Sequence, residues 1–181
     1  MATKILKKPY FSRPTLQVAR SLLGKYLVRK KGRKIFSGRI VEVEAYIGME
    51  DRACHASKGR TARTEVMFGP AGVSYVYLIY GMYHCFNIVT ERAGFPSAVL
   101  VRAVQDACTS VLIDGPGRVC RFLAIDRRLD RSDLTAGEAL WVEDRGERVA
   151  PSMISTGRRI GVDYAGLWAR KPWRFRLKNC D

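Results

Sequence analysis

The strongest constraint on the fold is the regular alternation of side chains through Val41–Tyr46, which reads Val-Glu-Val-Glu-Ala-Tyr. In an extended strand successive side chains point to opposite faces, so Glu42, Glu44 and Tyr46 share one face, with neighbours about 7 Å apart. Two acids and an aromatic ring therefore line one surface. This surface is either a solvated outer face or part of a functional site, and the strand alone leaves both alternatives open.

The remaining patterns favour several more strands and a few helices. A helix is expected after Ser12 as the capping residue, ending at Gly24, and another over Arg118–Ile125. A long ordered loop is expected over Gly48–Gly72. Strands are predicted over Lys25–Arg29, Lys34–Tyr46, Val73–Asn87 as a pair turning near Gly81, Ala98–Val104, Ala139–Glu143 and Trp173–Leu177.

Length and composition fit an ordinary globular protein with mixed α and β structure. The chain has 181 residues, of which 47% are hydrophobic and 27% are charged. These values exclude disordered, collagen-like and coiled-coil classes. We expect residues 1–181 to form a single domain, because the length does not require a second core.

The charge balance points to a polyanionic partner. Lys and Arg number 32 against 17 Asp and Glu, which gives a formal net charge of +15. Nucleic acid is the leading interpretation, with an anionic membrane surface or mere solubility as alternatives. No apolar run approaches the roughly 18 residues of a membrane span, so no membrane partner is expected.

Cysteine and histidine residues raise the possibility of zinc. The five cysteines are widely spaced and odd in number, which is typical of reduced thiols. The pairs Cys54-His55 and His84-Cys85 suggest a zinc deaminase or zinc-binding module. Because the chain has neither the H-x-E nor the C-x-x-C pattern of that class, we expect no metal.

A basic loop follows the acidic strand and contains His55, one of two histidines. Arginine, lysine and threonine side chains are the types that bind phosphate oxygens. The loop is either such a phosphate-binding segment or simply a solvated charged loop, and His55 alone is as consistent with a structural role. The residues of this kind are Arg52, Lys58, Arg60, Thr61, Arg63 and Thr64.

Four tyrosines lie within the nine residues Tyr75–Tyr83. Buried core is one interpretation of such an aromatic strand. Tyr80, beside Gly81 at the expected hairpin tip, has another: aromatic and apolar side chains of DNA-bending proteins enter the base stack.

Several blocks in one order resemble the alkyladenine (3-methyladenine) DNA glycosylases, and the resemblance runs through most of the chain. It departs at Ala62, where many relatives have proline, and at Val43, where threonine often stands. The matching blocks are Val43–Tyr46, Cys54–His55, Val66–Pro70, Tyr75–Met82, Val101–Ala103, Gly115–Gly117 and Trp168–Pro172.

The resemblance implies the roles of the residues that act on the sugar. Glu44 falls at the position of the general base, which deprotonates the water that attacks C1′. Arg102 falls where an arginine helps to hold this water. The backbone at Ile160 would complete the coordination of the water.

Further positions are implied for the base and the duplex. Tyr46 on one side, with His55 and Tyr77 on the other, would sandwich the flipped base, and Asn87 at the pocket wall would help to reject guanine. The residues implied to contact the duplex are Tyr80 and Met82 as intercalating side chains, and Arg60, Thr61 and Arg63 at phosphates.

The implied protein is a base-excision-repair enzyme that flips alkylated or deaminated purines from double-stranded DNA. It would hydrolyse the N-glycosidic bond without a cofactor and leave an abasic site. The implied fold is a compact α+β domain with a curved, mainly antiparallel sheet and a protruding β-hairpin. We expect a monomer, associated with the nucleoid in a prokaryotic cytoplasm or nuclear in a eukaryote.

Two other functions remain as alternatives beside the zinc module. A lyase-type glycosylase would attack the sugar through a lysine Schiff base, and Lys58 is the nearest candidate. A non-catalytic DNA-binding protein would also use basic charge and an inserting tyrosine. Glu44 distinguishes a hydrolase from this last class, because a protein that only binds DNA has no use for a carboxylate that faces phosphates.

Overall fold

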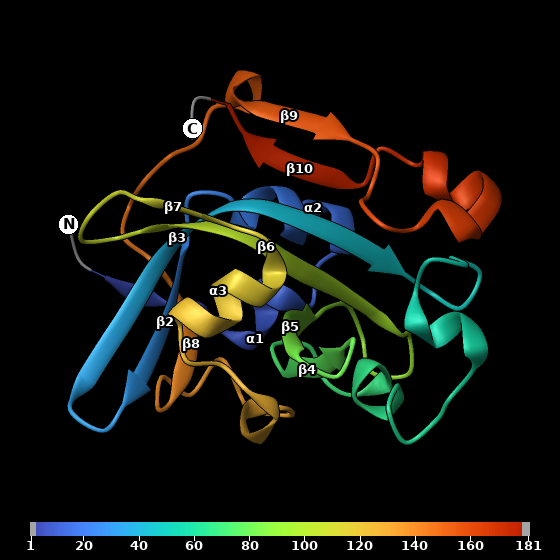
Figure 1. The fold of residues 1–181 in the computed structure, drawn as a ribbon, viewed down its shortest axis with the longest axis horizontal. Helices are drawn as coiled ribbons and strands as arrows, with labels where there is room; N and C mark the ends of the chain where they lie inside the picture. Colours follow the sequence, from blue (N-terminus) through green and yellow to red (C-terminus); the bar gives the residue numbers. More distant parts are fainter. Residues whose placement is uncertain (1–2, 179–181) are drawn as a thin grey trace.

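One long, bent strand, β3 (Lys34–Ile47), organises the molecule (Figure 1). The computed structural model describes residues 3–178. β3 pairs with β2 (Tyr26–Lys31) along its first part and with β6 (Ser97–Asp106) on its other side. The register between β3 and β6 shifts on both sides of Glu42, and such irregularities bend a strand. The bend therefore lies in the acidic segment.

Every strand pair in the sheet is antiparallel, which confirms the predicted α+β fold with a mainly antiparallel sheet. β10 (Arg174–Leu177) pairs with β3 over the acidic segment and also with β9 (Ile154–Gly157). β7 (Leu112–Asp114) pairs with β6. The main order is β1 (Lys4–Ile5), β8 (Leu140–Asp144), β2, β3, β6, β5 (Tyr83–Val89) and β4 (Ser74–Ile79).

Short helices complete the core of the domain. α2 (Thr15–Leu22) packs on β3 and β6, while α3 (Pro116–Phe122) packs on β5 and β6. The predicted cap of α2 is wrong. Pro14 occupies the N-cap position. Ser12 instead lies at the C-cap of a separate helix, α1 (Lys8–Phe11), where its hydroxyl donates to the Lys8 carbonyl.

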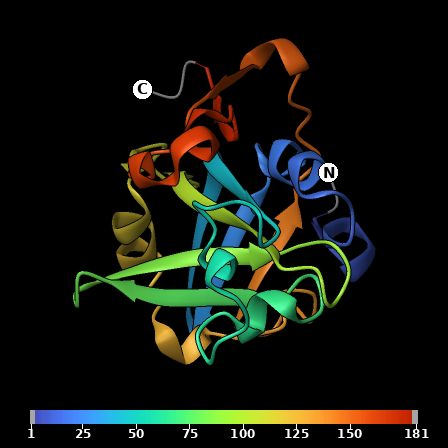
Figure 2. The ribbon, with the colours of Figure 1, turned by 90° about the vertical axis from the view of Figure 1, so that its right-hand side faces the viewer.

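The hairpin of β4 and β5 protrudes from the body of the molecule, as predicted (Figure 2). Tyr80 and Gly81 at its tip have φ angles of 53° and 69°. Glycine adopts positive φ readily, whereas a tyrosine there is uncommon and strained by roughly 1–2 kcal/mol. The turn thus holds Tyr80 in an unfavourable conformation at the most projecting point of the hairpin.

The segment between β3 and β4 is ordered, as expected, and contains two 3₁₀ helices, η1 (His55–Lys58) and η2 (Glu65–Phe68). Further 3₁₀ helices are η3 (Arg127–Leu129), η4 (Pro151–Met153) and η5 (Asp163–Arg170), of which η5 is interrupted at Gly166 and precedes β10. No helix between residues 3 and 178 has the length and apolar composition to cross a membrane. The cysteines within this range are free, and Cys180 lies outside it.

Candidate active site

The acidic face of β3 is buried, so its interpretation as a solvated outer face is wrong. Glu42 is 2% exposed and Glu44 is 0% exposed. The apolar face of the same segment, with Val41 and Val43, belongs to the main core. Both faces of β3 are therefore covered here, and the two carboxylates need partners to offset their desolvation.

Glu44 has a polar partner at each carboxylate oxygen. The Ile160 backbone amide donates to Oε1 at 2.8 Å, and the Tyr46 hydroxyl donates to Oε2 at 2.8 Å. The Arg102 guanidinium Nε lies 3.5 Å from Oε1. Burial raises the pKa of Glu44 above its ordinary value, while Arg102, the Ile160 amide and the Tyr46 hydroxyl oppose this rise.

Arg102 links the two carboxylates of the strand. Its Nε donates to Glu42 Oε1 at 3.2 Å, in addition to its contact with Glu44. Arg174 and Arg176 on β10 also approach Glu42, at 3.4 and 3.8 Å. Three arginines thus compensate one buried acid, which leaves Glu44 with Arg102 as its ion-pair partner among the described residues.

A pocket of about 270 Å³ is lined by residues that contact these carboxylates, although neither Glu42 nor Glu44 lines it directly. Tyr46, Arg102 and Ile160, which hold Glu44, all line it. The lining residues come from β3, the loop after it, the β4–β5 hairpin, β6, the start of α3 and residues 160–164, so distant parts of the chain meet here. The other predicted site residues in the lining are His55, Tyr77, Tyr80 and Asn87.

Aromatic rings form one wall of the pocket. The rings of His55 and Tyr77 meet edge to face, with centroids 4.7 Å apart, and His55 Nδ1 lies 2.9 Å from the Tyr75 hydroxyl oxygen. Burial, with the nearby charges of Arg63 and Lys58, lowers the pKa of His55 to about 4. His55 is therefore neutral at pH 7, and the wall carries no positive charge of its own.

Asn87 and Tyr46 are held by direct contacts. The Asn87 side-chain amide donates to the Tyr75 carbonyl at 3.1 Å, and the residue is 4% exposed. Tyr46 has its hydroxyl on Glu44 and the Arg159 guanidinium 4.8 Å from its ring centroid. Both side chains are thereby held in place by neighbouring residues.

The hairpin tip is far more open than the pocket. Tyr80 is 83% exposed and Met82 is 66% exposed. Tyr80 also lines the mouth of the pocket, whereas Met82 does not. Buried core is thus the right interpretation for Tyr75, whereas the exposed Tyr80 is outside the core and its entry into a base stack stays a prediction.

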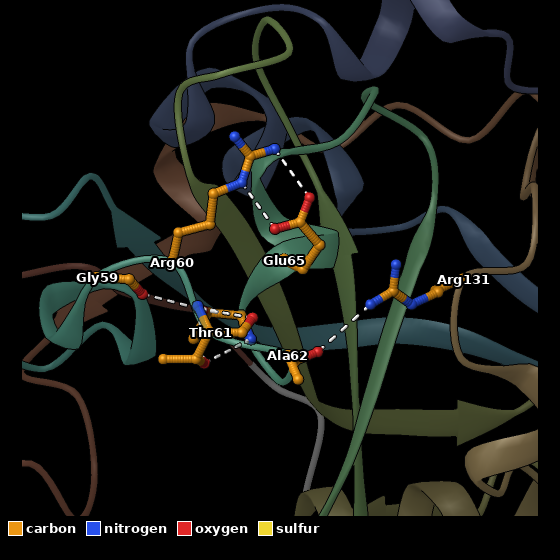
Figure 3. Close-up of polar contacts among 7 residues, drawn as sticks. Gly59, Arg60, Thr61, Ala62, Glu65 and Arg131 are labelled. Carbon is orange, nitrogen blue, oxygen red and sulfur yellow. Dashed lines mark hydrogen bonds and ion pairs between the residues drawn. The ribbon is translucent and has the colours of Figure 1, made fainter.

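The basic loop has internal partners that its sequence does not reveal (Figure 3). Arg60 forms a two-pronged ion pair with Glu65, at 2.7 and 2.8 Å. The backbone amide of Thr61 donates to Thr64 Oγ1, and Arg131 donates to the Ala62 carbonyl at 3.4 Å. The loop is thus folded on itself, and the charge of Arg60 is neutralised by an acid on η2.

Arg63 and Lys58 differ in their placement. Arg63 Nε donates to the Tyr75 hydroxyl at 3.3 Å, and its guanidinium lies 4.8 Å from the Tyr77 ring centroid. Arg63 lines a second hollow, which shares Tyr75 and Tyr77 with the main pocket, and does not line the main pocket itself. Lys58 is exposed and does not line the pocket, which gives the lyase alternative no support.

Sequence reasoning missed Asp51 and Arg159, which form a buried ion pair behind the pocket. It also missed Tyr164, a pocket-lining residue that is 72% exposed. For Arg159, the only indication in the sequence was its position next to Ile160. For Asp51 the sequence held no indication, because a single acid in a charged loop does not stand out. Within residues 3–178, no three histidine, cysteine or acidic side chains are grouped as a metal site requires.

Comparison with known proteins gives consistent matches over nearly the whole chain. The family model described as methylpurine-DNA glycosylase matches residues 9–181. A protein of Myxococcus xanthus is 52% identical over 177 residues, which cover 96% of this chain and 90% of the relative. A protein of Methanocella arvoryzae is 49% identical over 97% of this chain and 93% of the relative. A protein of Legionella pneumophila is 47% identical over 96% of this chain and 94% of the relative. Each is named "Putative 3-methyladenine DNA glycosylase".

Proposed function

The chain belongs to the methylpurine-DNA glycosylase family, and from this premise we propose that it releases damaged purines from duplex DNA with a water activated by Glu44. The observation that carries the proposal is the burial of the Glu44 carboxylate against three residues that line an aromatic pocket. A hydrolase needs a base in this position. A protein that only binds DNA gains nothing from burying an acid there.

The chemistry follows from the surroundings of Glu44. Arg102 and the Ile160 amide favour the ionised carboxylate, which can accept a proton from water. As the glycosidic bond breaks, the sugar acquires oxocarbenium character, which the same carboxylate stabilises. The water oxygen bonds to C1′, its proton passes to Glu44, and the bonding electron pair leaves with the base. Arg102 and the Ile160 backbone hold the water.

The pocket suits a purine that has left the duplex. Rotating a nucleotide out of the stack costs a few kcal/mol, and less when the base is damaged or mispaired. We propose that Tyr46 stacks on one face of the base and that His55 and Tyr77 contact the other. Electron-poor alkylated purines gain more from such rings than normal purines do. Asn87 would reject guanine at the wall.

The duplex is proposed to contact the hairpin and the basic loop. Tyr80 fills the gap that the everted nucleotide leaves, with Met82 beside it, and Arg60, Thr61 and Arg63 lie toward the phosphates. We further propose that residues 1–181 act as one domain and as a monomer, without metal or cofactor. The enzyme would act where its substrate lies, at the nucleoid or in the nucleus.

The test is a base-release assay on duplexes with one 3-methyladenine, 7-methylguanine, hypoxanthine or ethenoadenine. Glu44→Gln should abolish release while duplex binding persists. Glu143→Gln is the matched control, since Glu143 is 6% exposed and contacts Trp141 and Arg145 away from the pocket. Unchanged base release by Glu44→Gln would refute the role of Glu44 as general base. A covalent protein–DNA adduct trapped with borohydride would establish the lyase mechanism instead.

A further inference from the structure

A buried ion pair with no part in the proposed chemistry lies behind the pocket. Arg159 Nη1 and Nη2 meet the two carboxylate oxygens of Asp51 at 2.5 and 2.8 Å. Both side chains are 0% exposed. Burying such a pair generally adds little to stability, because desolvation offsets the attraction between the charges. Its presence so close to the pocket therefore calls for another reason.

The pair joins three segments that supply the site. Arg159 also donates to the carbonyl of Ala45, on β3, at 2.9 Å and to the carbonyl of Trp168, in η5, at 3.0 Å. Asp51 accepts the backbone amides of Ile47 at 3.2 Å and Ala53 at 3.1 Å. The end of β3, the loop that leads to His55 and the segment before β10 are thus tied to one pair of charges.

The ties to Ala45, Ile47 and Ala53 end at or next to a residue that contacts Glu44 or lines the pocket. Ile160, whose amide donates to Glu44, is the next residue after Arg159. The guanidinium of Arg159 lies 4.8 Å from the ring centroid of Tyr46, and Tyr46 donates to the other oxygen of Glu44. Arg159 does not line the pocket, so it contacts Tyr46 from outside it.

We propose that Arg159, held by Asp51, is a positioning residue that keeps the Ile160 amide and the Tyr46 hydroxyl on the carboxylate of Glu44. This inference rests on the proposed function. The pair acts on the rate of bond cleavage and not on the affinity for DNA, because its described contacts include neither the hairpin tip nor the part of the basic loop from Lys58 to Thr64.

The consequence for pH follows from the groups around Glu44. Arg102 on β6, the Ile160 amide and the Tyr46 hydroxyl lower the pKa of Glu44. Glu42 raises it. Cys85 on β5 also lies within electrostatic range of Glu44. Loosening the Ile160 and Tyr46 contacts removes two influences that favour the carboxylate. The acidic limb of the rate profile then moves to higher pH.

The experiment compares Arg159→Lys and Asp51→Asn with Arg39→Lys and Glu147→Gln. Arg39 and Glu147 form another two-pronged pair, remote from the pocket lining. Single-turnover release is measured from pH 5 to 9 on the lesion that the wild type releases fastest. The dissociation constant for the same duplex is measured in parallel, and all values are corrected for the folded fraction.

We expect either pocket-side variant to lower the rate constant by tenfold to a hundredfold, to move the acidic limb upward and to leave affinity within threefold. The double variant should be no slower than the slower single variant, since the two residues act as a unit. The inference is overturned if the variants have a lower melting temperature but an unchanged rate constant for base release. It is also overturned if Arg39→Lys lowers the rate constant and shifts the acidic limb to the same extent. Should one variant not fold, the other decides. A wild type that releases no base would instead refute the proposed function.

Discussion

The surroundings of Glu44 and the tip of the hairpin are built in opposite ways. Glu44 is fully buried behind the pocket lining with a partner at each carboxylate oxygen, and Arg102 joins it to a second acid. At the tip, Tyr80 is 83% exposed and strained, with Met82 exposed beside it. Groups that must act on developing charge are best fixed in advance, whereas a side chain that enters a duplex must be free to do so. The contrast therefore fits the chemical role proposed for Glu44 and the binding role proposed for Tyr80.

Among variants that keep Glu44, the largest effect should come from removing the cation beside it. Arg102→Met leaves two buried carboxylates without their shared partner, which raises the pKa of Glu44 further. Base release near pH 6.5 should fall by about a hundredfold or more, within the range of about 10²–10⁴ for general-base catalysis. Because a raised pKa is overcome by higher pH, the deficit should shrink toward pH 9. A deficit that is constant from pH 5 to 9 would contradict this account.

The second prediction concerns the tip. Tyr80→Ala should weaken binding to damaged duplex by about tenfold to a hundredfold, since stacking of a base on an aromatic ring contributes about 1–3 kcal/mol. Unfolding free energy should change by less than about 0.5 kcal/mol, because the side chain is exposed. Ile35→Ala is the control, as Ile35 is 64% exposed near another hairpin turn. Equal losses of affinity in both variants would remove the special role of Tyr80.

The smallest effect is expected at the basic loop. Glu65→Gln releases Arg60 from its ion pair, so one more cation becomes available to phosphate. Affinity at low salt should rise a few-fold, and the slope of log K against log salt should steepen by about 0.9. Fluorescence anisotropy between 50 and 200 mM salt measures both. An unchanged slope would mean that Arg60 lies away from the DNA.

Long strands with a clear sequence pattern could be predicted, whereas short strands and helix caps could not. The alternation around Glu44 and the aromatic run before Tyr80 predicted β3 and the β4–β5 hairpin, because a period of two residues is a local property. The short strands β1, β7 and β9 were not predicted, since two to four residues carry too little pattern. The Ser12 cap was wrong because a separate short helix lies before it.

The sequence by itself determined the α+β class, the basic surface, the hairpin with Tyr80 at its tip and, through its motif blocks, the family. It also placed Glu42 and Glu44 on one face of a strand. Only the tertiary structure decided that this face is buried, since the covering groups come from β6, β10 and the Arg159–Ile160 segment. Likewise, it paired Arg60 with Glu65 and Asp51 with Arg159. Periodicity records which residues share a face, whereas burial and charge pairing depend on distant segments that pack against it.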